Sequence, residues 1–327
     1  MKYTLKLILL LLVACNLFAQ KQAAKPLFRD PIYDGAADPV VIYHKKEKTW
    51  LMFYTNRRAT INDSTGVAWV HGTPIGVAAS KDGGATWQYR DTVRIDYKVG
   101  NDTYWAPEII EHKGLYHIYL THVPGIFKNW NAPRAILHLT SKNLMDWHYE
   151  STLKLASDKV IDAAVFRLPN KKWGMWYNNE RDKKSTYYAE SDDLYHWTEK
   201  GKAIGDRGEG PKVFRWKDKY WLINDPWKGL GVYSSDDLVT WKKQANTILG
   251  EAGTGLDDGV IGGHADVVVN HDKAYIFYFT HPGRTKGKEK LGGFEQRRSS
   301  IQVAELQYKD GEITCDRNAP TYIKLTQ

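Results

Sequence analysis

The sequence of 327 residues predicts an all-β fold: a five-bladed β-propeller with four-stranded blades around a central funnel. Two repeated patterns predict it. A hairpin of two apolar strands occurs five times, and a Ser-containing turn that ends in Trp follows four of the hairpins. The hairpins open at residues 38, 106, 162, 210 and 264, which places the copies 68, 56, 48 and 54 residues apart. Such spacings are in the range expected of propeller blades.

The hairpin pattern is clearest in the fourth copy. Residues 209–216 are mainly apolar or β-branched, residues 217–219 form a polar turn, and residues 220–223 are an aromatic and aliphatic run. Two such runs joined by a short polar turn indicate antiparallel strands. The other copies are residues 38–54, 106–119, 162–177 and 264–278.

The second pattern predicts the outer half of each blade. Ser and Asp or Asn side chains bond their own backbone in a turn, and we expect the following Trp to pack between neighbouring sheets. These segments are residues 80–87, 141–147, 191–197 and 235–241, which end in Trp87, Trp147, Trp197 and Trp241. The fifth unit, which ends near residues 300–306, lacks the Trp, as terminal repeats often depart from the pattern.

The first 20 residues predict a signal peptide. Lys2 and Lys6 precede the apolar run 7–14, which is too short to span a bilayer. Residues 12–15 resemble a bacterial lipobox, in which Cys15 carries a lipid anchor, and residues 18–20 suit an ordinary cleavage site equally well. We therefore expect an exported protein, either periplasmic, secreted or an outer-membrane lipoprotein, with one propeller domain over residues 25–327.

The net charge and the aromatic content limit the classes of binding partner that we expect. The formal charge of +8 becomes +6 without Lys2 and Lys6, and the basic residues are scattered apart from a cluster at residues 284–290 and 297–298, so nucleic-acid binding is not expected. The mild basicity suits an acidic polysaccharide or serves solubility. Thirteen Trp and twenty Tyr suit both blade packing and stacking on sugars, and both interpretations stay open for four Trp near blade entrances or in loops, which are Trp69, Trp105, Trp130 and Trp227.

Carboxylates from three blades are predicted to meet in the funnel, because the first strand of each propeller blade lines the central channel. Asp38, Asp162 and Glu209 open three of these strands. Inverting hydrolysis of a glycosidic bond needs a carboxylic acid and a carboxylate base roughly 6.5–9.5 Å apart. A third carboxylate raises the pKa of the acid by like-charge repulsion.

Four short motifs at these openings resemble glycoside hydrolase family 43. They are Ala37-Asp38-Pro39, residues 161–166, Glu209-Gly210-Pro211 and Gly263-His264. The resemblance implies an inverting glycosidase in which Asp38 is the general base, Asp162 modulates pKa and Glu209 is the general acid. It also implies that His264 helps to hold a hydrated, structural calcium ion in the central channel, although the chemistry requires no cofactor.

Other residues at the funnel are candidates for substrate binding. Trp105 is a platform for a sugar ring and Glu108 a hydrogen-bonding group of the funnel wall. Arg57 and Arg284 are expected to bind substrate, with surface exposure as the alternative for Arg284. Asp225, before Pro226, is interpreted as a turn residue.

The expected substrate is a plant-type oligosaccharide or polysaccharide that loses terminal sugars. The resemblance favours an α-L-arabinofuranosidase, with a β-xylosidase or a galactofuranosidase or galactosidase as alternatives. Ala163-Ala164 replaces the family's more usual Pro-Ser, and residues 55–58 differ from common xylosidases. A carbohydrate-binding propeller without catalysis also stays open. A glycan phosphorylase would need basic side chains converging on phosphate, and the blade openings show none.

Overall fold

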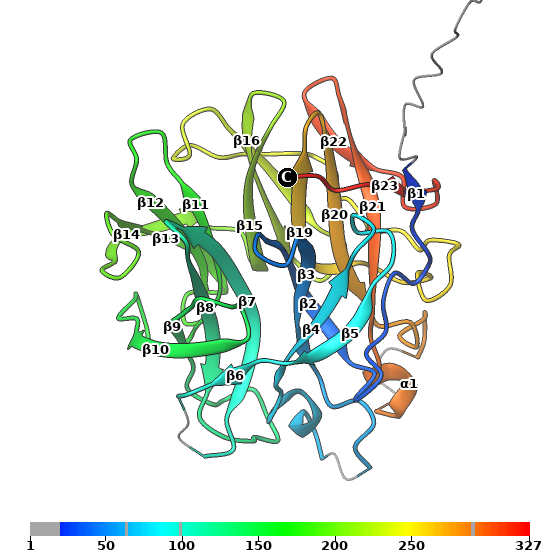
Figure 1. Cartoon of the computed structure of the whole chain (residues 1–327), viewed down its shortest axis with the longest axis horizontal. Helices are drawn as coiled ribbons and strands as arrows, with labels where there is room; N and C mark the ends of the chain where they lie inside the picture. Colours follow the sequence, from blue (N-terminus) through cyan, green and yellow to red (C-terminus); the bar gives the residue numbers. More distant parts are fainter. Residues whose placement is uncertain (1–19, 63–64, 98–99, 289–291) are drawn as a thin grey trace, which may run out of the picture.

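The computed structural model confirms the five-bladed propeller (Figure 1). It describes residues 20–327 except 63–64, 98–99 and 289–291, so the predicted signal peptide and Cys15 lie outside the described residues. Within this part of the chain, no helix has the length and apolar character needed to cross a membrane.

Each blade is an antiparallel sheet whose strands follow one another in the sequence. Blade 1 comprises β2 (Ala36–His44), β3 (Thr49–Asn56), β4 (Ile75–Ser80) and β5 (Gln88–Thr92); blade 2 comprises β7 (Thr103–His112), β8 (Leu115–Val123), β9 (Ala135–Ser141) and β10 (Asp146–Thr152), with β6 (Arg94–Ile95) parallel to β10. Blade 3 comprises β11 (Val160–Arg167), β12 (Trp173–Asn179), β13 (Ser185–Ser191) and β14 (Thr198–Ile204). Blade 4 comprises β15 (Glu209–Trp216), β16 (Lys219–Asp225), β17 (Gly231–Ser235) and β18 (Lys242–Lys243); blade 5 comprises β19 (Gly263–Asn270), β20 (Lys273–Thr280), β21 (Ser300–Lys309) and β22 (Glu312–Cys315).

The two ends of the described chain meet beside blades 1 and 5. The short strands β1 (Lys21–Gln22) and β23 (Tyr322–Ile323) pair with each other (Figure 1). The N–H of Leu325 then donates to the carbonyl of Gly83 in blade 1 at 2.7 Å. Strand β1 thus lies slightly before the predicted domain start at residue 25. Two short helices lie in loops, η1 (Ala68–Val70) and α1 (Phe294–Arg297).

The Trp residues of the turns pack between blades, as predicted. Trp147 of blade 2 is fully buried and lies edge-on to Phe53 of blade 1, with ring centroids 6.5 Å apart. Its turn is held by Ser141, whose hydroxyl accepts the N–H of Leu144 at 2.9 Å. The same arrangement joins the other pairs of blades that have this Trp, namely Trp87 to Phe277, Trp197 to Tyr119, and Trp241 to Trp176.

The innermost strands of blades 1 to 4 share a bulge near their start. At this point the pairing register shifts and one residue has a positive φ, between 45° and 58°. These residues are Asp38, Ala106, Asp162 and Gly210. Blade 5 has a shorter irregularity at His264. Gly210 also has no room for a side chain, because a Cβ there would lie 2.5 Å from the His264 ring.

Candidate active site

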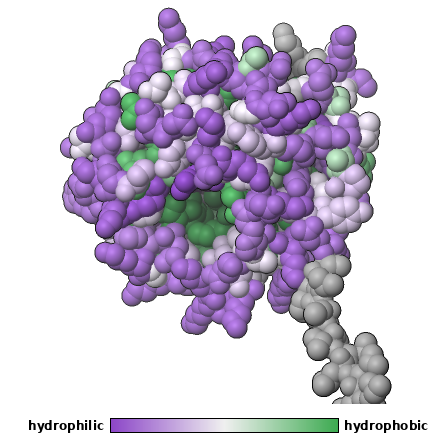
Figure 2. Space-filling model, turned by 90° about the horizontal axis from the view of Figure 1, so that it is seen from above, coloured by the Kyte–Doolittle hydropathy of each residue, from purple (hydrophilic) through white to green (hydrophobic). Residues whose placement is uncertain are grey.

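A pocket of about 700 Å³ lies over the bulges, and its walls come from all five blades. The pocket lies on the side of η1 and α1, at the lower side of Figure 1, whereas Figure 2 shows the opposite face of the molecule, which is also hollowed and has apolar residues in the depth of the hollow and a hydrophilic rim. The pocket is lined by Asp38, Arg57, Trp69, Val70, Trp105, Trp130, Arg134, Lys159, Ile161, Asp162, Glu180, Arg181, Lys184, Arg207, Glu209, Asp225, Trp227, His264, Phe279, His281 and Arg284.

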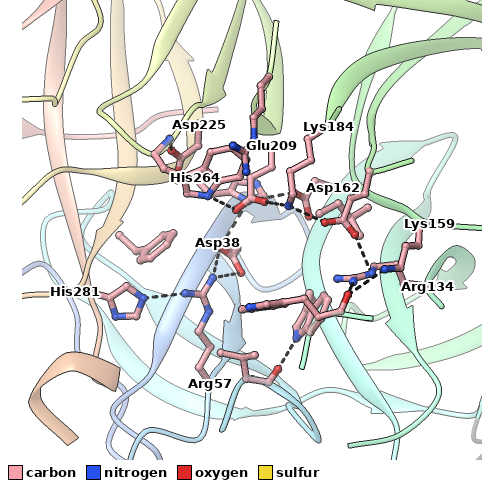
Figure 3. A pocket seen from close by; sticks show the side chains of 18 of the residues that line it. Asp38, Arg57, Arg134, Lys159, Asp162, Lys184, Glu209, Asp225, His264 and His281 are labelled. Carbon is pink, nitrogen blue, oxygen red and sulfur yellow. Dashed lines mark hydrogen bonds and ion pairs between the residues drawn. The ribbon is translucent and has the colours of Figure 1, made fainter. Parts of the chain in front are cut away.

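Asp38 is buried at the wall between blades 1 and 5 and is paired with an arginine (Figure 3). Nη2 of Arg57 donates to both carboxylate oxygens, at 3.0 and 3.2 Å. Nη1 of Arg57 lies 3.0 Å from Nε2 of His281, and its guanidinium lies 4.7 Å from the centre of the Phe279 ring. Burial, with Arg284 and Arg57 as further causes, lowers the pKa of His281 well below its usual value. A neutral His281 therefore accepts from Arg57 and holds it against Asp38.

Asp162 is buried on the blade 3 side of the same space. Its Oδ2 accepts the N–H of Gly210 at 3.0 Å, and its own N–H donates to Oγ1 of Thr121 at 3.0 Å. Burial first, then the charges of Glu209 and Asp38, raise the pKa of Asp162 well above its usual value. Burial and the neighbouring carboxylates therefore favour the protonated form of the Asp162 carboxyl group.

Glu209 is half-buried and its carboxylate meets two donors. Oε1 accepts Nε1–H of Trp227 at 3.1 Å, and Oε2 lies 3.3 Å from Nζ of Lys184. Lys184 also pairs with Glu180 at 2.7 Å, and Nε of Arg134 lies 2.9 Å from the second oxygen of Glu180. Glu209 thus begins a chain of alternating charges along the blade 3 wall (Figure 3).

His264 lies between the carboxylates. Its Nδ1 is 3.6 Å from Oδ1 of Asp38 and 4.0 Å from Oδ2 of Asp162, and its backbone N–H donates to Oδ2 of Asp225 at 3.0 Å. Burial, then Glu209, raise the pKa of Asp225 to about 7. Asp225 does form the predicted turn bond, to the N–H of Trp227 at 2.7 Å, but it also lines the pocket.

The central channel below the pocket holds an ammonium group between two carboxylates. Nζ of Lys212 is bound by Glu108 at 2.8 Å and by Asp266 at 2.9 Å, so an ammonium group already satisfies these carboxylates. Calcium needs six to eight oxygen ligands, and among the described residues no group of three or more His, Cys, Asp or Glu is arranged to hold a metal ion. The implied calcium at His264 therefore finds no matching ligand set in the residues that the structure describes.

Three of the four predicted substrate-binding residues line the pocket, namely Trp105, Arg57 and Arg284. Glu108 does not, because it is buried in the channel against Lys212, and its Oε1 accepts the N–H of Val165 at 3.0 Å. All four Trp residues left open above line the pocket: Trp69, Trp105, Trp130 and Trp227.

Sequence reasoning missed most of the charged groups on the blade 3 side. None of these groups lies at the start of an innermost strand, where the repeated motifs occur. Arg134 directly precedes β9, and Glu180 and Lys184 lie in the loop between β12 and β13. Basic side chains therefore do converge on the funnel, although the blade openings carry none. One signal in the sequence could have placed Asp225 at the pocket, because it is the cross-strand partner of Glu209 in the predicted hairpin.

Comparisons with known proteins identify the family of this chain and support its fold. Residues 28–224 match the model of glycosyl hydrolases family 43. Among solved structures, the chain is similar to a thermostable family-43 glycoside hydrolase (TM-score 0.66, 18% identity, 91% of this chain and 98% of that chain). It is also similar to a β-xylosidase/α-arabinofuranosidase from a compost microbial metagenome (TM-score 0.63, 16% identity, 90% and 98% covered).

A further solved relative is a family 43 β-1,3-galactosidase (TM-score 0.64, 15% identity, 91% and 97% covered). A probable sucrose-6-phosphate hydrolase of Psychromonas ingrahamii is 26% identical over 155 residues, which span 40% of this chain and 28% of that protein. The structural likenesses establish the fold, and the family model covers more than half of the sequence. The chain belongs to glycosyl hydrolases family 43.

Proposed function

We propose that this protein is an inverting glycoside hydrolase that removes terminal sugars from plant-type oligosaccharides or polysaccharides. One observation carries the proposal. Asp38, Asp162 and Glu209, from three different blades, line one pocket, and each has a different electrostatic environment. Separate environments are what divide the roles of base and acid among residues of the same type.

In the proposed reaction Asp38 is the general base. Its pairing with Arg57 suits a carboxylate that must be ionised to take a proton from the attacking water. The water oxygen bonds to the anomeric carbon as the glycosidic bond breaks, so the configuration inverts. Asp162, bound to the backbone of Gly210, positions the bulge and the sugar without changing its own protonation.

Glu209 is the proposed general acid, which gives its proton to the departing oxygen. Once that proton has left, the carboxylate formed has two donors in place: Trp227 Nε1–H and the Lys184 ammonium. The protonated acid and the deprotonated base are both restored by exchange with solvent after the products leave.

The sugar is proposed to be α-L-arabinofuranose, with β-xylose, galactofuranose or galactose as alternatives. The family relatives named above act on xylosides, arabinofuranosides and galactosides, which supports these candidates without separating them. Trp69, Trp105 and Trp130 offer aromatic faces for sugar rings at the pocket wall. We also propose export, with or without a lipid on Cys15, from the sequence pattern alone.

The test is release of 4-nitrophenol from a panel of aryl glycosides: α-L-arabinofuranoside, β-D-xyloside, β-D-galactofuranoside and β-D-galactopyranoside. We expect Asp38→Asn and Glu209→Gln to lower kcat by about 10²–10⁴-fold without loss of folding. The exposed Asp91→Asn is the matched control and should keep wild-type rates. NMR of the first-formed anomer then reports inversion.

Three outcomes would contradict the proposed function or one of its assignments. Turnover that survives Asp38→Asn unchanged means that the base is assigned wrongly. Retention of the anomeric configuration contradicts the inverting mechanism. Glycan binding by a wild type that hydrolyses neither aryl glycosides nor polysaccharides favours the carbohydrate-binding propeller.

A further inference from the structure

The pocket of this protein carries more cationic than anionic side chains. Five acidic residues line it, against seven basic ones: Arg57, Arg134, Lys159, Arg181, Lys184, Arg207 and Arg284. A neutral sugar would not neutralise this positive charge. A cation without a carboxylate partner within the protein is therefore the best candidate to bind an anion.

Most of the buried basic groups are already paired. Arg57 is bound to Asp38, and Arg134 and Lys184 are bound to Glu180. These pairs are part of the wall and need no further anion. Lys159 donates to the carbonyl of Trp130 at 3.0 Å, and Arg207 is exposed and lies 4.7 Å from the centre of the Trp227 ring.

Arg284 is partly buried and has no carboxylate partner among the described residues. Its Nε donates to the carbonyl of Gln296 at 2.8 Å, which fixes the guanidinium, and its charged group lies 5.9 Å from the centre of the Trp69 ring. No carboxylate among the described residues lies within ion-pair distance of it, and its terminal nitrogens have no hydrogen-bond acceptor in that part of the chain. Arg284 is nevertheless only partly exposed and lines the pocket.

A second guanidinium lies near Arg284. Burial first, then the charge of Arg57, lower the pKa of Arg284 to about 10. Arg284 therefore remains charged at neutral pH, in an arrangement where two cations repel and only Arg57 has a carboxylate. An anion at this wall would relieve both the repulsion and the cost of burial.

We propose that the substrate carries an anionic group, the carboxylate of a uronic acid or a sulfate ester, and that Arg284 binds it beside Arg57. The proposal rests on the proposed glycosidase function and names the substrate class of the same pocket. A guanidinium suits this role because its planar fork donates two parallel hydrogen bonds to a carboxylate or to a sulfate. The contact of Arg284 with Gln296 leaves that fork available, and Trp69 supports its face.

The experiment measures binding of matched monosaccharide pairs by isothermal titration calorimetry. D-Glucuronate is compared with D-xylose and D-galacturonate with L-arabinose, because each acid adds a carboxylate to the ring of its neutral partner. D-Galactose 6-sulfate compared with D-galactose is the sulfate arm. We expect the acidic member of at least one pair to bind about 10- to 100-fold more tightly.

Three variants identify the residue. Arg284→Gln should remove the preference for the acidic member, and Arg284→Lys should keep only part of it because a lysine lacks the fork. Arg181→Gln is the control: Arg181 lines the same pocket, but it is exposed and already paired with Asp158 at 2.8 Å. It should keep the wild-type preference, and thermal unfolding checks that each variant is folded.

The carboxylate and sulfate arms distinguish the two anions. Equal affinity within every pair, no binding of any acidic member below 10 mM, or a preference that survives Arg284→Gln overturns the proposal. So does turnover that requires inorganic phosphate and yields a sugar 1-phosphate, because Arg284 would then bind a co-substrate. Hydrolysis of neutral glycosides with no acid preference refutes only this inference, whereas acid preference with no hydrolysis counts only against the glycosidase.

Discussion

Replacing Lys212 by Met should destabilise the propeller strongly. The ammonium group lies between two buried carboxylates, 2.8 Å from Glu108 and 2.9 Å from Asp266, and these residues belong to three different blades. Removing the cation leaves two buried like charges without their partner. Breaking a buried ion pair in this way costs about 3–5 kcal/mol, and we expect the free energy of unfolding to fall by that amount at pH 7.

The magnitude should depend on pH. Burial already raises the pKa of Glu108 even with Lys212 beside it. Without the cation, protonation becomes easier, so the loss caused by Lys212→Met should be smaller at pH 5 than at pH 7. Adding Glu108→Gln and Asp266→Asn removes the two charges and should recover most of the stability.

Urea unfolding followed by tryptophan fluorescence measures these differences. The control is Lys219→Met in the same blade, where a mostly exposed pair with Asp236 should contribute less than about 1 kcal/mol. A loss below 1 kcal/mol for Lys212→Met, or a loss that is the same at both pH values, would refute the reasoning. We also expect EDTA to leave the wild-type melting temperature unchanged, and calcium to stabilise only the Lys212→Met variant.

Three further predictions concern the pocket and the blade interfaces. The pKa of Asp225, about 7, lies above its usual 3.8, so its stabilising contribution is present below pH 4 and is lost as pH rises through 7. Urea unfolding should therefore show that the free energy of unfolding of the wild type, relative to that of Asp225→Asn, falls by about 4 kcal/mol between pH 4 and 8. Lys184→Met should move the alkaline limb of the pH–rate profile to higher pH, because the proposed acid loses a cation at 3.3 Å, and an unmoved limb would contradict that assignment. Trp147→Ala should cost about 3–5 kcal/mol in urea unfolding, whereas Trp130→Ala, 53% exposed, should cost less than about 1 kcal/mol; similar losses would contradict the packing role.

The fold was predictable from the sequence because its signals are local and repeated. Strand pairs joined by short turns and the Trp of each outer turn need only neighbouring residues to be recognised, and both patterns were confirmed in the blades. The meeting of Asp38, Asp162 and Glu209 followed from the repeat alone, since equivalent positions of a propeller converge on one axis.

The partners of the charged groups could not be predicted in the same way. Glu108 was expected in the funnel wall, but the bulge at Ala106 inserts an extra residue and changes which face the following side chains occupy. Its partner Lys212 comes from another blade, 104 residues away. Glu180 and Lys184 follow the second strand of blade 3, and their contact with Arg134 depends on loop paths that no periodic pattern encodes.

The bulges of the inner strands have the same backbone conformation whether or not the residue there has a reactive side chain. A left-handed conformation at a residue other than glycine costs on the order of 1–3 kcal/mol, and such cost is usually attributed to catalysis. Here Ala106 adopts it with φ 45° and offers no reactive group, while Asp38 and Asp162 adopt it and do. The conformation is therefore inherited from the blade as a module. Blades 1 to 4 supply equivalent positions at the funnel, and substituting the residue at such a position is a route to new chemistry that leaves the scaffold unaltered.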